Sequence, residues 1–383
     1  MIKKIACLLL GVVIAASSIN ANAATKRSKT PKRVAFDTDM QHVLDSLDVV
    51  GLSIAVVKNN QIVYNKSYGV QDIKTKVPVT NNTMFRIASI SKSFSGVSIM
   101  QLVEQGKLTL DTDVNKVLPF TVRNPKHPEV PITVEMLLSH TSSLNDSEGY
   151  YIDLDCINPG KNANYKNAYN DYKPGTKYEY CNLNFSLLGS IIEKVSGERF
   201  DLYVKRHIVQ PLGLEASFNI NDVPAKRIGK LYSWNGKEYE EQNAYRPITG
   251  LENYKLTESS VTFSPAGGMK ISARNLAKYM IMHMNYGKSP LAKTRILSEE
   301  SSKCMQVEHT PGFHYGLALE QTDEYTPGKV LVGHTGGAYG LRSAMFFDPE
   351  QKYGLVMICS GCKDGNIIIN KVLGVMYKHF IVK

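Results

Sequence analysis

The sequence predicts an α/β protein, an α+β sandwich in which an antiparallel sheet built from both chain ends is flanked by terminal helices, with a mostly helical lobe inserted. Three observations support this class. β-rich runs lie near both ends, helical spacing and glycine stops mark the middle, and 383 residues exceed the size at which one core stops growing. Two sequential domains would leave the strand edges of each terminal group unpaired. We therefore expect one lobe from residues 37–88 plus 262–383 and a helical lobe from residues 89–261.

The N-terminal part of the sheet is expected from two short runs, residues 51–57 and 61–68, which are rich in β-branched and aromatic side chains. Lys58-Asn59-Asn60 separates the two runs and predicts a hairpin turn. The middle of the chain then shows helical spacing or glycine stops in four segments: 94–105 ending at Gly106, 134–138, 186–195 ending at Gly197, and 275–284 ending near Gly287.

The C-terminal part of the sheet is expected from four further strand-like runs, which Gly, Pro and Asp interrupt. They are residues 315–320, 329–333, 342–348 and 353–360. An apolar helical pattern over residues 367–380 follows them. Because strands lie near both termini, we expect the two groups to pair in one sheet.

The first 36 residues carry a large share of the positive charge. Residues 1–23 have a basic start, a twelve-residue apolar run and small residues ending at Ala23, the layout of a signal peptide cut after Ala23, so we expect a periplasmic or secreted protein. Five more basic residues in a flexible tail over residues 24–36 suit contact with an anionic envelope surface. Without both groups the formal charge of +10 falls to +3, from 38 basic and 35 acidic residues, which does not indicate a nucleic-acid partner.

No transmembrane segment is expected in the mature chain, because the apolar run of the signal is too short to span a bilayer of about 30 Å. The mature chain keeps five cysteines: Cys156, Cys181, Cys304, Cys359 and Cys362. In an oxidising compartment an odd number leaves at least one thiol free, and their pairing stays open. No second C-x-x-C and no paired histidine ligand set accompany them, so we expect neither a metal nor another cofactor.

The first candidate catalytic motif is Ser89-Ile90-Ser91-Lys92, at the start of the predicted buried helix. A spacing of three residues places Ser89 and Lys92 on one helical face, so that the amine can reach the hydroxyl. The helix N-terminus favours an oxyanion beside Ser89. The spacing alone is weak, since Ser360-Gly-Cys-Lys363 repeats it after a strand-like run.

Two further motifs supply polar groups. Tyr180-Cys181-Asn182 is expected on a loop before the third predicted helix, where the phenol can accept a proton and the amide can orient a substrate carbonyl or Lys92. His334-Thr335-Gly336-Gly337 follows the strand predicted for residues 329–333. Its small residues let a substrate lie along the strand edge, and its last amide is an expected oxyanion donor.

In this order and context, S-x-x-K, Y-x-N and [K/H]-T-G resemble the serine β-lactamase and penicillin-binding superfamily, most closely its class C β-lactamase, D,D-peptidase and esterase branch. Flanking segments agree, namely residues 106–111, 137–141, 211–213 and 266–268. The resemblance spans roughly residues 40–380 and implies a β-lactamase/transpeptidase-like catalytic domain over residues 37–383.

The resemblance also implies roles for individual residues. Ser89 is the implied acyl-forming nucleophile, while Lys92 and Tyr180 share general-base and general-acid work. Which of the two is the base stays open, because a free lysine or tyrosine holds the wrong protonation state at pH 7 and one must be shifted. The cleft and oxyanion hole are implied to involve Asn182, His334, Thr335, Gly336, Gly337 and the Ser89 amide.

The chain departs from the pattern of the branch at three positions. His334 replaces the usual lysine and, with an ordinary pKa near 6.5, is a poor permanent anchor for a substrate carboxylate; Arg342 is considered as a substitute anchor. Ser143 stands where glycine is usual after His-Thr-Ser, and Cys181 lies inside Y-x-N as a small packed residue.

We therefore expect an exported serine hydrolase or acyltransferase that forms an acyl-enzyme at Ser89 from a small-molecule or peptide ester or amide and passes the acyl group to water or another acceptor. The alternative is a β-lactamase or D,D-peptidase that acts on cell-wall peptides. A hypothesis from another class is a non-catalytic ligand-binding homologue, against which the complete set of motif residues argues.

Overall fold

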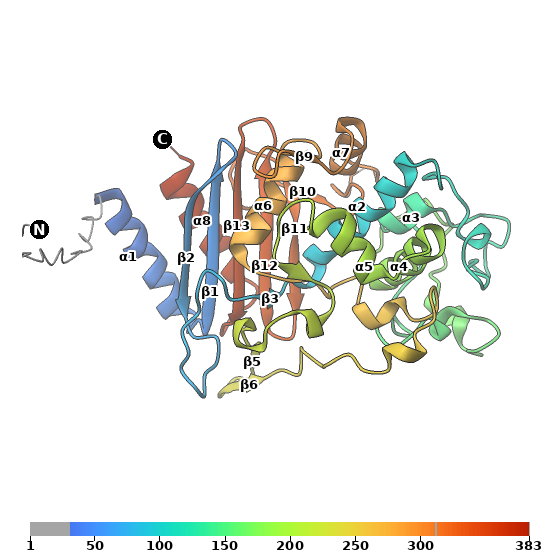
Figure 1. The fold of residues 1–383 in the computed structure, drawn as a ribbon, viewed down its shortest axis with the longest axis horizontal. Helices are drawn as coiled ribbons and strands as arrows, with labels where there is room; N and C mark the ends of the chain where they lie inside the picture. The colour runs from blue at the N-terminus through green and yellow to red at the C-terminus, as the bar shows by residue number, and fades with distance from the viewer. Residues whose placement is uncertain (1–30, 311, 383) are drawn as a thin grey trace, which may run out of the picture.

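The computed structural model describes residues 31–310 and 312–382 (Figure 1). The predicted signal peptide and residues 24–30 of the predicted tail lie outside the described residues. The end of that tail was predicted wrongly, because helix α1 (Pro31–Ser46) already begins inside it. Phe36 of α1 is only 1% exposed and its ring packs against Tyr64 and Phe380, so burial of this aromatic side chain holds the segment on the fold.

One six-stranded antiparallel sheet combines both chain ends, as predicted. Its order is β10-β11-β12-β13-β1-β2. The strands are β1 (Gly51–Lys58), β2 (Gln61–Gly69), β10 (Glu320–Thr322), β11 (Leu331–Ala338), β12 (Leu341–Asp348) and β13 (Tyr353–Gly361). The hairpin between β1 and β2 is confirmed too: Asn59 and Asn60 have φ values of 48° and 64°, which suit a tight two-residue turn.

Helices cover both faces of this sheet (Figure 1). The terminal helices α1 and α8 (Ile368–Phe380) pack together on one face, and α6 (Ala273–Met284) packs on the other. The side chains of β1 divide between the two faces as strand alternation requires. Ile54 belongs to the core beneath α1 and α8, whereas its neighbour Ala55 belongs to the core on the α6 side.

The middle of the chain is mostly helical and lies to the right of the large sheet in Figure 1. Its helices are α2 (Ser91–Glu104), α3 (Val134–Leu138), α4 (Asn182–Ser196) and α5 (Phe200–Val204), with α7 (Glu299–Gln306) nearby. Helix α4 ends where its sequence predicts, because Gly197 adopts a left-handed φ of 74°. Three small sheets complete the fold: β3 (Phe85–Arg86) with β7 (Lys270–Ile271) and β4 (Ala216–Ser217), β5 (Tyr232–Trp234) with β6 (Tyr239–Glu241), and β8 (Lys288–Ser289) with β9 (Thr294–Arg295).

Two of the predicted C-terminal strands differ from the structure. Residues 315–320 form a tight turn rather than a strand: the Gly316 amide donates to the Leu319 carbonyl, and Ala318 has a φ of 61°. Strand β11 is longer than predicted and runs through His334 and both glycines of the third motif. Glycine usually weakens a strand, but β12 pairs with this segment along its whole length.

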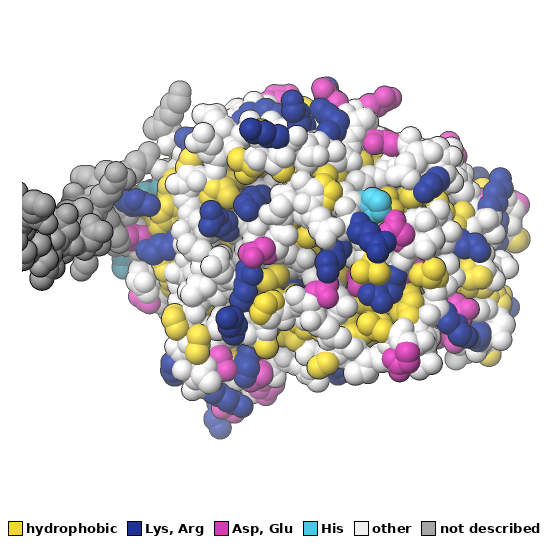
Figure 2. All heavy atoms as spheres, viewed as in Figure 1, with side chains coloured by type: hydrophobic (Ala, Val, Ile, Leu, Met, Phe, Trp, Pro, Cys, Tyr) yellow, Lys and Arg dark blue, Asp and Glu magenta, His cyan; other side chains and the backbone are white. Residues whose placement is uncertain are grey.

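The described surface carries both signs of charge. On the face in Figure 2, Lys and Arg side chains are interspersed with Asp, Glu and hydrophobic side chains. Within residues 31–310 and 312–382, no helix combines the length and the apolar character needed to cross a bilayer.

Candidate active site

Ser89 lies in a short 3-10 helix, η1 (Ala88–Ile90), which leads directly into α2. The preceding turn is strained, because Ala88 has a φ of 47°, in the left-handed region that alanine rarely occupies. Ile87 is held by its amide, which donates to the Met269 carbonyl at 3.0 Å. Both neighbours of Ser89 are buried while Ser89 itself is partly exposed, so this turn presents the hydroxyl to solvent.

Lys92 is fully buried beneath Ser89, one helical turn along, as predicted. Its Nζ lies 3.1 Å from Ser89 Oγ, 2.7 Å from Asn182 Oδ1 and 3.0 Å from the Ala266 carbonyl oxygen. The last two atoms can only accept hydrogen bonds, whereas a serine hydroxyl can donate. A neutral amine satisfies all three contacts by donating to the two carbonyl oxygens and accepting the Ser89 proton. The geometry therefore suits Lys92 as a base toward Ser89.

Burial lowers the pKa of Lys92 from 10.5 to about 7. The charge of Arg86 lowers it further, while Asp146 and Cys181 oppose the shift. A lysine with a pKa near 7 is neutral in about half of the molecules at pH 7, compared with roughly one in 3,000 at the ordinary value. Of the two groups that the sequence leaves open as the base, burial therefore shifts the pKa of Lys92 toward neutral pH.

Tyr180 lies beside Lys92 and is 37% exposed. Lys92 Nζ is 4.9 Å from the centroid of the Tyr180 ring, and the buried ring of His140 packs on it with centroids 4.3 Å apart. Burial raises the pKa of Tyr180 above its ordinary value, and a hydrogen bond with Ser89 only partly offsets this. The phenol is therefore protonated at neutral pH and suits proton donation rather than proton abstraction.

Asn182 is oriented by Asp146, a residue that the sequence analysis missed. Asp146 Oδ2 accepts from Asn182 Nδ2 at 2.7 Å and from the Asn182 amide at 3.0 Å, and Oδ1 accepts from the Leu183 amide at 2.9 Å. This fixes the amide so that its oxygen points at Lys92. Asn182 was predicted on a loop but is the first residue of α4, where a carboxylate that accepts from backbone amides is favoured.

Cys181 and Ser143 have structural explanations. The Cys181 side chain is buried and its Sγ lies 3.3 Å from Asp146 Oδ1, which suits the packed residue expected from sequence. Ser143 has a φ of 64°, a conformation that favours glycine, and its Oγ accepts from Asn124 Nδ2 at 2.9 Å. The backbone geometry thus explains why glycine is usual at this position.

His334 lies on β11 and is only 2% exposed. Its Nε2 is 2.9 Å from the Tyr315 hydroxyl and its Nδ1 is 2.6 Å from the Thr335 carbonyl oxygen. A neutral ring satisfies both contacts by donating from Nδ1 and accepting at Nε2. Burial lowers the pKa of His334 to about 3, so the ring is uncharged at neutral pH and does not anchor a substrate anion.

Strand β11 brings the two glycines of the third motif next to η1. A methyl group at Gly336 would lie 2.3 Å from the Ile87 carbonyl oxygen and 2.4 Å from Ser343 Oγ, so only glycine permits this close approach. Gly337 is exposed one residue further along the strand. Thr335, on the same strand, has its amide bound by Glu320 Oε1 at 2.8 Å, a contact that the sequence did not indicate.

Arg342 does not line the cleft, contrary to the possibility considered from sequence. Its Nε donates to the Gly365 carbonyl at 3.1 Å. Its neighbour Ser343 donates to Ile87 next to the site, and adjacent side chains on a strand point to opposite faces of the sheet. The Arg342 side chain therefore lies on the face away from Ser89.

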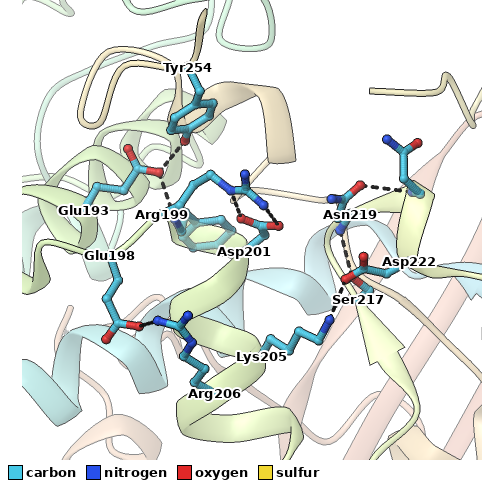
Figure 3. A network of polar contacts seen from close by, with 12 residues as sticks. Glu193, Glu198, Arg199, Asp201, Lys205, Arg206, Ser217, Asn219, Asp222 and Tyr254 are labelled. Atoms are coloured by element: carbon cyan, nitrogen blue, oxygen red, sulfur yellow. Dashed lines mark hydrogen bonds and ion pairs between the residues drawn. The ribbon is translucent and has the colours of Figure 1, made fainter. Parts of the chain in front are cut away.

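A polar network ties residues 254–257 to helix α4. Glu193 of α4 accepts from the Tyr254 hydroxyl (Figure 3). It also accepts from the Thr257 amide at 2.7 Å. Arg199 and Asp201 form a bidentate pair beside them, with contacts of 2.6 and 3.0 Å. Because Glu193 ties residues 254–257 to α4, the same helix positions both Asn182 and the approach to Ala266.

All five cysteines that follow the predicted signal peptide lie in the described residues. Within residues 31–310 and 312–382, the five cysteines form no disulfide. The same residues contain no group of three or more His, Cys, Asp or Glu side chains placed to hold a metal ion.

The fold and this cluster define the class of serine β-lactamases and penicillin-binding proteins, a class of serine hydrolases. The chain belongs to the Beta-lactamase family, whose model matches residues 36–365. The superfamily and fold predicted from the motifs are thereby confirmed.

Individual relatives are more distant. The chain is 28% identical over 340 residues to Protein flp from Staphylococcus aureus (strain MRSA252), covering 85% of this chain and 62% of that protein, so it spans about three fifths of that relative. Among solved structures it is similar to the octameric penicillin-binding protein homologue from Pyrococcus abyssi, with a TM-score of 0.73, 27% identity and coverage of 90% and 77% of the two chains. EstCE1, described as a hydrolase with promiscuous acyltransferase activity, shares the fold with a TM-score of 0.71 at 23% identity, over 90% and 98% of the chains.

Proposed function

We propose that this protein is an exported serine hydrolase or acyltransferase that forms an acyl-enzyme at Ser89 from an ester or amide. The observation that carries the proposal is the buried amine of Lys92, 3.1 Å from Ser89 Oγ, with a pKa of about 7. A base with a pKa near the working pH combines a useful fraction of the deprotonated form with sufficient proton affinity.

In acylation, the Ser89 hydroxyl proton moves to Lys92 while Oγ forms a bond to the substrate carbonyl carbon. The carbonyl oxygen takes the negative charge and is stabilised by the amides of Ser89 and Gly337. Collapse of this intermediate breaks the bond to the leaving oxygen or nitrogen, which takes a proton from Tyr180, and Lys92 returns its proton to the tyrosine. Asn182 keeps the amine aligned, and His334 contributes a neutral wall beside Tyr180.

In deacylation, an acceptor releases the acyl group. Water gives hydrolysis, while an alcohol or amine gives acyl transfer, and the ratio depends on which acceptor reaches the ester. The description of EstCE1 as a hydrolase with promiscuous acyltransferase activity supports including both outcomes.

The second candidate is a β-lactamase or D,D-peptidase acting on cell-wall peptides, which the similarity to a penicillin-binding protein homologue favours. The neutral His334 argues against it, because it offers no charge to a β-lactam carboxylate. Turnover of a chromogenic cephalosporin far above that of a 4-nitrophenyl ester would select this alternative.

The proposal is tested by labelling with a fluorophosphonate probe. The wild-type chain should be labelled at Ser89, and Ser89→Ala should not be labelled. Ser98→Ala is the matched control, because the Ser98 hydroxyl lies on the same helix and donates to the Phe94 carbonyl at 2.9 Å, so its loss should leave labelling intact. Labelling that persists in Ser89→Ala would overturn the assignment, and a wild-type chain that is not labelled would favour a homologue that binds ligands without catalysis. Export is tested separately by N-terminal sequencing, which should begin at residue 24.

A further inference from the structure

Arg86, on β3 three residues before Ser89, is held in one orientation. Its Nε donates to the Gly267 carbonyl at 2.7 Å and its Nη2 donates to Ser264 Oγ at 3.0 Å. The guanidinium carbon lies 5.1 Å from the centroid of the Tyr339 ring, within the range of a cation–π contact. Arg86 is only partly buried as a residue.

This guanidinium lies next to the nucleophile turn. A methyl group at Gly267 would be 3.5 Å from Arg86 Nη2 and 3.7 Å from the backbone of Ala88. Since both groups lie within 3.7 Å of the same methyl position, Arg86 Nη2 is at most roughly 7 Å from the backbone of Ala88, the residue that precedes Ser89. The charge of Arg86 also lowers the pKa of Lys92, as a nearby cation does.

Arg86 has no acidic partner among the residues that the structure describes. Two other partly buried arginines do: Arg123 pairs with Asp113 at 2.6 Å, and Arg199 pairs with Asp201 at 2.6 Å. A guanidinium carries five N–H donors, and the two side-chain bonds of Arg86 use two of them. The remaining donors form a planar, preorganised fork, the geometry that matches a carboxylate.

We propose that Arg86 is the anion anchor of the acyl-donor subsite, and that the preferred acyl donors carry a carboxylate a few bonds from the reacting carbonyl. This inference rests on the proposed acyl-enzyme at Ser89 and names its substrate class. The buried, uncharged His334 does not supply such an anchor, and Arg342 bonds the Gly365 carbonyl instead of facing Ser89.

The test compares two esters of equal length, the 4-nitrophenyl monoester of glutaric acid and its neutral methyl ester. Wild-type kcat/KM should favour the anionic ester by about 10- to 100-fold, the range expected for a charge-assisted hydrogen-bonded pair. Arg86→Gln should reduce the ratio to near one, and Arg86→Lys, which keeps the charge but not the fork, should restore part of it. Turnover of the neutral ester by each variant shows separately how far the substitution changes the basicity of Lys92.

A second measurement uses only the wild-type chain, in case Arg86 variants fold poorly. Glutarate should inhibit hydrolysis of the neutral ester competitively, at least about tenfold more strongly than glutaramide. Any of three results would overturn the anion anchor: a wild-type ratio near one, an unchanged ratio in Arg86→Gln, or equal inhibition by glutarate and glutaramide. Normal turnover of the neutral ester would in each case still support the proposed function. If neither ester acylates Ser89, the proposed function fails and takes this inference with it.

Discussion

The Asp146→Asn substitution separates positioning from electrostatics in this site. Asp146 holds the Asn182 side chain by a 2.7 Å bond, and Asn182 in turn accepts from Lys92 at 2.7 Å. The carboxylate also raises the pKa of Lys92 against the effect of burial. An asparagine of the same size removes the charge, so Lys92 should lose its proton at a lower pH.

The size of this change follows from the geometry. Two bonds of 2.7 Å on either side of one amide place the carboxylate and the amine roughly 7 Å apart. At an effective dielectric constant of about 20, two unit charges at this separation interact by about 2 kcal/mol. This energy corresponds to between one and two pH units, so the pKa of Lys92 should fall from about 7 to roughly 5.5.

The assay is the pH dependence of kcat/KM for a neutral 4-nitrophenyl ester, which reports groups of the free enzyme. In the wild-type chain the rate should fall about tenfold per pH unit below about 7. In Asp146→Asn the acidic limb should move down by one to two units, while the plateau falls at least about tenfold because Asn182 is less well oriented.

Glu148→Gln is the matched control. It removes the same charge two residues away, where Glu148 bonds Asn162 and Asn167 instead of Asn182. Its acidic limb should stay at the wild-type position. An unmoved limb in Asp146→Asn, or one that moves to higher pH, would refute the assignment of this limb to Lys92.

Two further predictions concern packing and stability. Gly336→Ala should push the turn before Ser89 out of place, lower the free energy of unfolding in urea by about 1–3 kcal/mol and abolish probe labelling. Gly337→Ala should lower the free energy of unfolding less, because its methyl group would contact the Arg342 side chain, with Nη1 at 3.3 Å. Equal losses of stability in the two variants would contradict the packing argument. Hydrogen bonds to the Cys304 thiol and, at 2.8 Å, to Glu135 raise the pKa of His309 to about 9. The contribution of protonated His309 to folding stability is therefore complete below pH 6.5 and is lost as the pH rises through 9. Wild-type stability should therefore drop by up to about 3 kcal/mol between pH 6.5 and 9.5, and His309→Gln should drop distinctly less, whereas parallel curves would exclude this role.

Local sequence signals predicted much of the fold. The paired asparagines after β1 and the glycine after α4 set turns by their backbone conformation, which depends on few neighbours. The extent of β11 was missed because two glycines usually end a strand, and only the approach of Ile87 explains why they are needed inside one. The start of α1 was missed because five basic residues in residues 24–36 favoured a flexible tail, although Phe36 in the same segment is buried and anchors it.

The motif residues of the site were predicted from their order along the chain and from the family resemblance, since each motif alone is a weak signal. Ser89 and Lys92 are linked by helical spacing, and Lys92 reaches Asn182 directly. Asp146 and Arg86 carry no periodic signal, since each acts through tertiary contacts with segments far along the chain. Such residues are found only when the backbone has brought those segments together.

Arg86 lowers the pKa of Lys92 and Asp146 raises it, and this balance links catalysis to the charge of the substrate. Burial alone would make the amine a weaker base, Arg86 weakens it further, and Asp146 restores part of its proton affinity. A carboxylate bound to Arg86 would offset the positive charge of the guanidinium and strengthen Lys92 as a base at the moment when the substrate arrives. With a lysine in place of His334, a second fixed cation would oppose this effect. The uncharged histidine and an arginine that has no acidic partner among the described residues are therefore consistent parts of one electrostatic arrangement.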